Sequence, residues 1–176
     1  MKISIREEHP SDDKEIECVI EMAFRHAEHT DHQEHKLVAK IRETNAYQPD
    51  LTFVAVDNER IVGHIVLSKI TIKNDNDHAD SLALAPVSVL PVYQGRGIGS
   101  QLIQHALSKA TELGHQSVIV LGHEAYYPRF GFTRASDWKI VAPFDVPDES
   151  FMAIELQPNA LQHVHGTVHY SRAFNE

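Results

Sequence analysis

The chain contains little cysteine and no long apolar run. Cys18 is the only cysteine among 176 residues, which excludes a disulfide framework and any zinc or iron–sulfur site built from cysteines. No stretch approaches the roughly 18 uninterrupted apolar residues that a membrane-spanning helix needs. The first residues, Met1 to Arg6, contain no apolar signal-peptide core. We therefore expect a cytoplasmic protein without a membrane partner.

Positive charge is scarce as well. The chain has 16 Lys and Arg against 25 Asp and Glu, which gives a formal net charge of −9. Nucleic-acid binding requires clustered Lys and Arg that neutralise phosphates, so we expect no nucleic-acid partner. With 42% hydrophobic and 23% charged residues, the composition is that of a folded globular protein. The length fits a single domain, residues 1–176.

Apolar periodicity predicts alternating strands and helices. Helices are expected after Ser11, after Thr30 (with Gln33 completing a capping box) and after the glycines near 97, with a short helix at 124–130. Strands are expected at 2–6, 52–56, 61–72, 82–92, 117–121, 138–141, 150–156 and 166–170. Pro86 and Pro91 lack an N–H, so the strand at 82–92 should be bulged or splayed.

The most informative segment joins this strand to the clearest helix of the chain. Its sequence is Gln94-Gly95-Arg96-Gly97-Ile98-Gly99-Ser100. Glycines let a backbone turn tightly and approach a ligand, and the first N–H groups of a helix are unpaired at the positive end of its dipole. The segment therefore predicts a pyrophosphate-binding loop, with a plain strand-to-helix turn as the alternative. A P-loop is excluded because no Lys follows the glycines, and the glycine spacing differs from the dinucleotide-binding fingerprint.

These residues resemble the GNAT superfamily of acetyl-CoA-dependent N-acetyltransferases. Gln94, Gly97 and Gly99 match its signature [Q/R]-x-x-G-x-[G/A], and Tyr127 matches the tyrosine that often lies four residues before a Gly-Phe pair. The resemblance covers about residues 2–157 and leaves a C-terminal extension at 158–176. It implies an α/β (α+β) fold with a mixed, mostly antiparallel central sheet. That sheet is splayed between its fourth and fifth strands and carries helices on both faces.

The resemblance also implies the cosubstrate and the reaction. Acetyl-CoA would place its pantetheine along Val89 and Leu90 and its pyrophosphate on the backbone of Gln94–Ser100. A main-chain N–H near Leu90 would polarise the thioester carbonyl. A primary amine of a small molecule or protein would attack directly, without a metal. Tyr127 would then protonate the leaving thiolate, the alternative being that it packs with Tyr126 beside the cofactor.

The general base is not identified by the sequence. Glu124, His123 and the His and Glu residues of the first two helices are all candidates, whereas Ser88 suits the positioning of a water better than proton removal. Cys18 is interpreted as a small helix residue. Four histidines recur every third residue and are interpreted as a polar segment across a loop, not as a metal site: His26, His29, His32 and His35.

Three functions remain open at this stage. The first is the acetyltransferase, in which the partners are acetyl-CoA and an amine acceptor, and a homodimer is left open. The second is a non-catalytic acetyl-CoA-binding sensor or interaction module, which would tolerate loss of Tyr127 while keeping the glycines. The third is a binder of another phosphate ligand at the same helix terminus.

Overall fold

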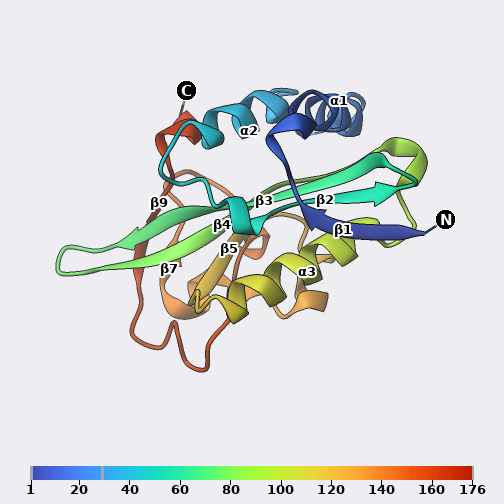
Figure 1. Ribbon diagram of the computed structural model, residues 1–176. Coiled ribbons are helices and arrows are strands. Elements are labelled where there is room, and N and C mark those ends of the chain that lie inside the picture. The colour runs from blue at the N-terminus through green and yellow to red at the C-terminus, as the bar shows by residue number, and fades with distance from the viewer. Residues whose placement is uncertain (1, 29, 176) are drawn as a thin grey trace.

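The computed structural model describes residues 2–28 and 30–175, and within them a nine-stranded sheet lies between helices (Figure 1). The helices are α1 (Asp13–Phe24), α2 (Glu34–Arg42) and α3 (Ile98–Glu112). The strands are β1 (Ile3–Glu7), β2 (Thr52–Asp57), β3 (Arg60–Lys73), β4 (His78–Val89), β5 (Ser117–Leu121), β6 (Thr133–Arg134), β7 (Ile140–Val141), β8 (Phe151–Glu155) and β9 (Gly166–His169). None of the helices in these ranges is long and apolar enough to cross a membrane.

The strand order is β1-β2-β3-β4-β5-β8-β6, and β9 pairs with both β3 and β7. The β4–β5 and β7–β9 pairs are parallel, and the other pairs are antiparallel. The predicted mixed, mostly antiparallel sheet is therefore confirmed. The predicted hairpin also forms, because Asn58 and Glu59 adopt the positive φ angles, 46° and 70°, that a tight β2–β3 turn requires.

The two faces of the sheet are covered by different helices (Figure 1). Gly63 of β3 faces α3, since a Cβ at this position would lie 3.0 Å from Cδ1 of Leu102. Neighbouring residues of a strand point to opposite faces, so His64 points to the other side, where α1 and α2 pack. The core therefore forms two layers, one on each face of the sheet.

β4 and β5 separate after a short stretch of pairing. Their register contains only Leu82–Val118 and Ala83–Ile119. Farther along β4, the pairing with β3 shifts by one residue around Pro86, which follows a cis peptide bond. The predicted bulge and splay are both confirmed. The edge of β4 that faces β5 is consequently left open toward Val89.

Several element boundaries differ from the sequence predictions. α2 begins at Glu34 and not at Thr30, so the predicted capping box is wrong. The Thr30 hydroxyl instead hydrogen-bonds the Glu34 carboxylate and accepts the N–H of His32, which builds a turn before the helix. The short helix expected at 124–130 is a 3₁₀ turn at Tyr127–Phe130, and only Ile140–Val141 of the strand expected at 138–141 is extended.

The C-terminal extension is part of the core. β9 pairs with the distal half of β3, and Leu161, Val168 and Ala173 are buried. The last described residues return to α2, beside which the C-terminus lies in Figure 1. The resemblance leaves the extension at 158–176 outside the core, but the strand predicted at 166–170 is present as β9, and its pairing with β3 brings the extension into the core.

Burial of α3 yields a stability prediction. Leu102 is fully buried against the sheet, whereas Leu113 at the end of the same helix is 44% exposed. Leu102→Ala should lower the free energy of unfolding by about 2–5 kcal/mol through lost burial and the remaining cavity, and Leu113→Ala by less than about 1 kcal/mol. Urea unfolding of both variants measures the difference. Equal losses would contradict the packing described for α3.

Candidate functional site

The glycine segment and the end of β4 form one groove of about 340 Å³, which we call the loop groove. The predicted residues that line it are Val89, Gln94, Gly95, Gly97, Ile98, Gly99 and Ser100. Leu90 and Arg96, also predicted to contact a cofactor, are absent from this lining. The structure therefore brings most of the predicted cofactor-binding residues together on one side of the sheet.

Backbone conformation explains why glycines occupy the loop. Gly95 and Gly97 have φ angles of 78° and 81°, in the left-handed region that other residues rarely adopt. Gly97 is the residue before α3, so the first N–H groups of the helix open into the loop groove. The side chain of Ile98 is buried in the core, which leaves its backbone as the part that faces the groove. A helix start of this kind binds anionic groups such as a pyrophosphate.

The backbone of Leu90 is already used within the protein, which corrects the prediction for this residue. Its N–H donates to the carbonyl of Val62 over 2.9 Å, and its carbonyl accepts the N–H of Tyr93 over 2.8 Å. Backbone N–H groups alternate in direction along a strand, so that of Val89 points away from β3, toward the open edge. The Val89 carbonyl accepts a bond from Nε2 of Gln94. A thioester at this edge would therefore meet the N–H of Val89, not that of Leu90.

Three residues of the loop groove are not among the predicted cofactor-binding residues: Tyr93, Tyr126 and Arg129. The Tyr126 hydroxyl lies 3.0 Å from Oγ of Ser100, and the Arg129 guanidinium stacks over the Tyr126 ring at 4.5 Å. This places a cation beside the helix start, where it would complement a phosphate. Arg129 stands two residues after Tyr127 in the sequence, and this closeness to the predicted catalytic residue was the available signal. No role is assigned to Arg129 from the sequence alone.

Tyr127 begins the 3₁₀ turn that follows β5, and its side chain is buried. Its ring packs against Gly122, just after β5, where a Cβ would lie 2.2 Å from Cε2 of the tyrosine. It also meets Phe132 edge to face at 5.8 Å between ring centroids. Burial, with a smaller contribution from Tyr126, raises the pKa of Tyr127 to about 12. The hydroxyl therefore keeps its proton at neutral pH.

A second space opens where β4 and β5 separate, with a volume of about 470 Å³. We call it the apolar cavity. Its lining contains no charged side chain: Ala83, Leu84, Ala85, Ile119, Leu121, Pro143, Phe144, Tyr170 and Phe174. Phe144 stacks on Tyr170 at 6.0 Å between centroids, and Tyr170 meets Phe174 at 5.0 Å. The C-terminal extension thus supplies part of its wall.

A cluster of polar side chains is buried beneath α1 and α2. Glu8 accepts bonds from Arg42 (Nε to Oε2, 3.1 Å; Nη2 to Oε1, 2.9 Å) and from the Tyr47 hydroxyl (2.6 Å). Nε2 of His64 lies 2.8 Å from the same carboxylate. Although burial opposes ionisation, these hydrogen bonds lower the pKa of Glu8 to about 2. Burial also lowers the pKa of the fully enclosed His64, against the opposing effect of Glu8.

The candidates for a general base do not converge on one place. His123 and Glu124 are exposed, and Nδ1 of His123 accepts the N–H of Ala125. His26 and His32 lie in the connection between α1 and α2, as predicted, and His29 lies outside the described residues. His35 forms a surface group with Glu17 and Glu21 whose potential donor atoms lie within 4.8 Å of one another. Cys18 is exposed on α1.

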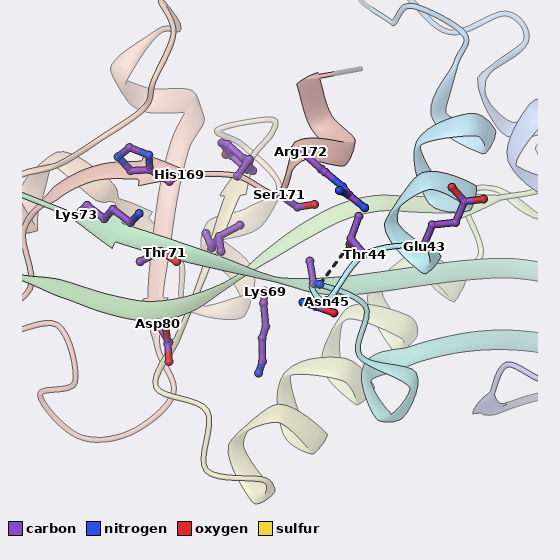
Figure 2. A pocket seen from close by; sticks show the side chains of 13 residues that line it. Glu43, Thr44, Asn45, Lys69, Thr71, Lys73, Asp80, His169, Ser171 and Arg172 are labelled. Atoms are coloured by element: carbon purple, nitrogen blue, oxygen red, sulfur yellow. Dashed lines mark hydrogen bonds between the residues drawn. The ribbon is translucent and has the colours of Figure 1, made fainter.

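A groove larger than the loop groove is remote from the predicted site. It has a volume of about 570 Å³ and lies along the edge of β3. Figure 2 shows Lys69 and Lys73 extending from β3, His169 from β9, and Arg172 from the turn that follows. None of the predicted cofactor-binding or catalytic residues lines it. Its size therefore does not identify the reaction centre.

Comparison with known proteins agrees with this geometry. Residues 18–132 match the model of the acetyltransferase (GNAT) family. The uncharacterized N-acetyltransferase YjhQ of Escherichia coli is 37% identical over 79% of this chain and 75% of its own length. The crystal structure of the E. coli GNAT N-acetyltransferase YhbS in complex with CoA has a TM-score of 0.89, with 29% identity over 100% of this chain and 93% of that chain. A Brucella melitensis GNAT acetyltransferase in complex with acetyl-CoA has a TM-score of 0.81, with 32% identity over 98% of both chains.

The buried His64 predicts how stability depends on pH. Because its folded pKa lies below the unfolded value of about 6.5, the unfolded state binds the proton first, and stability falls as pH drops below 6.5. Between pH 7 and 5 this loss amounts to at most about 2 kcal/mol. Because the pKa of Glu8 is lowered from 4.5 to about 2, its protonation causes a further loss of stability as pH falls through this range.

Urea unfolding at pH 7 and pH 5 tests the histidine contribution. His64→Gln should reduce the loss of stability between the two pH values, whereas His78→Gln, at an exposed position, should leave it unchanged. An unchanged loss in His64→Gln would show that this imidazole does not cause the pH dependence.

Proposed function

Because the chain belongs to the acetyltransferase (GNAT) family and is therefore an acyltransferase, we propose that it transfers the acetyl group of acetyl-CoA to a primary amine by direct attack. The observation that carries the proposal is the loop groove, where an anion-binding helix start adjoins the open edge of β4. The complexes of the two similar proteins with CoA and acetyl-CoA support the choice of cosubstrate.

In this proposal the cosubstrate is bound mainly by backbone groups. The pyrophosphate lies on the N–H groups at the start of α3, with Arg129 as a nearby counter-charge. The pantetheine continues along β4 as an added strand, with the N–H of Val89 as a donor on the open edge. The thioester then lies in the gap between β4 and β5. Backbone donors fixed in this way stabilise the oxyanion of the tetrahedral intermediate without reorganising.

The acceptor amine occupies the apolar cavity in this proposal. The cavity meets the same gap and has no charged lining residue, so it favours an amine attached to an apolar or aromatic body. It also disfavours a permanently charged group, which would lose its hydration there without gaining a partner. A small aromatic or aliphatic amine and an apolar N-terminal residue of a protein both satisfy this description.

Proton transfer completes the proposed reaction. The amine nitrogen attacks the thioester carbonyl, the C–N bond forms, and the C–S bond breaks. Tyr127, packed against Gly122 and Phe132, gives its proton to the departing thiolate of CoA. Its raised pKa keeps it protonated until that thiolate forms.

The role of Tyr127 can be measured against its neighbour. Tyr127→Phe keeps the ring and removes the proton donor, so the turnover number should fall at least about tenfold while acetyl-CoA affinity changes little. Tyr126→Phe removes the bond to Ser100 and should act mainly on affinity. Thiol release across a panel of amines gives both kinetic constants. If Tyr127→Phe is fully active, the proton comes from another group.

The glycine loop has a matched control at the other end of the same helix. Gly97 and Gly114 have φ angles of 81° and 86°, and a Cβ at either position would meet no atom within 4 Å. Alanine should therefore strain both sites equally, by about 1–2 kcal/mol. Only Gly97→Ala places a methyl in the loop groove, and it should weaken acetyl-CoA binding at least tenfold by calorimetry. Equal acetyl-CoA affinities in the two variants would show that the glycine loop does not bind the cosubstrate.

The same assays separate an enzyme from a non-catalytic acetyl-CoA-binding module. Thiol release that depends on an added amine supports the acetyltransferase. Tight acetyl-CoA binding without release for any amine supports a module that only binds the cosubstrate.

A further inference from the structure

The buried polar cluster contains a carboxylate–imidazole pair that no step above uses. Glu8 follows β1, and His64 lies in the middle of β3, with side chains that are 3% and 0% exposed. Glu8 also accepts the bonds from Arg42 and Tyr47, so its oxygens are surrounded by donors. Such enclosure of an ionisable pair is costly unless its geometry is well satisfied.

The pair determines which nitrogen of His64 carries the proton. A carboxylate accepts hydrogen bonds and cannot donate them, and the low pKa of Glu8 keeps it ionised. Nε2 of His64 must therefore be the protonated nitrogen at 2.8 Å from Oε1. Because burial keeps the imidazole neutral near pH 7, Nδ1 carries a free lone pair. A carboxylate orients a catalytic histidine in the same manner in hydrolase triads.

The residue directly opposite His64 in the sheet carries another buried polar atom without a partner. Neither Nδ1 of His64 nor Oγ of Ser88 has a hydrogen-bond partner among the described residues, although both atoms are buried. The two residues are directly opposed in the β3–β4 register, so their side chains share one face of the sheet. Ser88 immediately precedes Val89, whose N–H points to the open edge. Buried polar atoms without partners are rare and commonly mark a bound water or a functional group.

We propose that His64, oriented by Glu8, accepts the proton that the acceptor amine loses, through one water held between Nδ1 of His64 and Oγ of Ser88. The proposal rests on the acetyl transfer proposed above. As the C–N bond forms, the amine proton passes to the water, and the water passes one of its own protons to Nδ1. The C–S bond breaks, and the thiolate takes its proton from Tyr127. The imidazolium then loses its proton to solvent and Tyr127 regains one, so the net products are the amide and the free thiol of CoA.

The surroundings of His64 support this direction of transfer. Glu8 stabilises the imidazolium that forms, while Arg42 of α2 opposes it. Other ionisable groups near the cluster include Asp12 in the turn before α1, which is paired with Arg6 at 2.8 Å, Asp13 of α1, which lies 3.7 Å from Arg42, and the phenol of Tyr47. Asp13 partly offsets the guanidinium charge of Arg42, and Asp12 weakly favours the imidazolium. His64 can therefore take a proton transiently and release it afterwards.

Steady-state thiol release at pH 6 to 10 tests the proposal. In His64→Gln, the turnover number at pH 7 should fall at least about tenfold and should recover as pH rises, because hydroxide replaces the lost base. The KM for acetyl-CoA should stay unchanged. His105→Gln is the matched control, since His105 of α3 packs on Phe53 on the opposite face of the sheet. A wild-type pH profile in His64→Gln, or a loss that is equal at every pH, overturns the proposal.

Two further measurements test the proposal even if His64→Gln fails to fold. Ser88→Ala removes only a hydroxyl. Its turnover number at pH 7 should fall less than that of His64→Gln and should likewise recover as pH rises. Nitrogen-15 NMR of the wild-type imidazoles should show His64 neutral with its proton on Nε2, and a proton on Nδ1 would overturn the proposal without any activity measurement. Wild-type protein that binds acetyl-CoA but acetylates no amine would instead refute the proposed function, and with it this role of His64.

Discussion

The separation of β4 from β5 is the constraint on which the whole site depends. Two parallel strands that begin as neighbours stay paired over only two residues each, and the irregularity at Pro86 carries β4 away from its partner. An unpaired strand edge inside a sheet leaves backbone groups without acceptors and donors, which is unfavourable unless something else binds them. Here the side chain of Gln94 covers one carbonyl of that edge. The remaining edge is available to a ligand with amide groups of its own.

The same separation connects the two faces of the sheet. The loop groove opens on the α3 side, and the buried polar cluster lies beneath α1 and α2 on the other. The apolar cavity opens between β4 and β5, where the strands part. In the proposed reaction, acetyl-CoA and the amine would therefore approach the gap from separate spaces. Closely packed helices on both sides hold the gap in a fixed shape, which favours a reaction that depends on positioning.

Local patterns allowed much of the fold and of the cofactor loop to be predicted from the sequence. Each of these patterns depends only on residues close together in the sequence: the apolar spacing of α3, the turn between β2 and β3, and the glycines at 95–99. The direction of the Leu90 N–H could not be predicted, since it depends on the register between β3 and β4. His64 was read only as a strand residue because its partner Glu8 lies 56 positions earlier. The strand at 166–170 was predicted, but its pairing with β3 could not be, so the place of Tyr170 and Phe174 in the apolar cavity was missed.

The two spaces share β4 but are completed by different segments of the chain. The loop groove is completed by residues 93–100 with Tyr126 and Arg129, whereas Phe144, Tyr170 and Phe174 complete the apolar cavity. In the proposed reaction, substitutions at these three aromatic residues would reshape the acceptor side without altering residues 93–100 of the loop groove. Divergence among related chains is then expected to concentrate in the later segment, so that new acceptors arise on an unchanged cosubstrate half. The position of β9 in the sheet makes this region a module on which selection for substrate can act by itself.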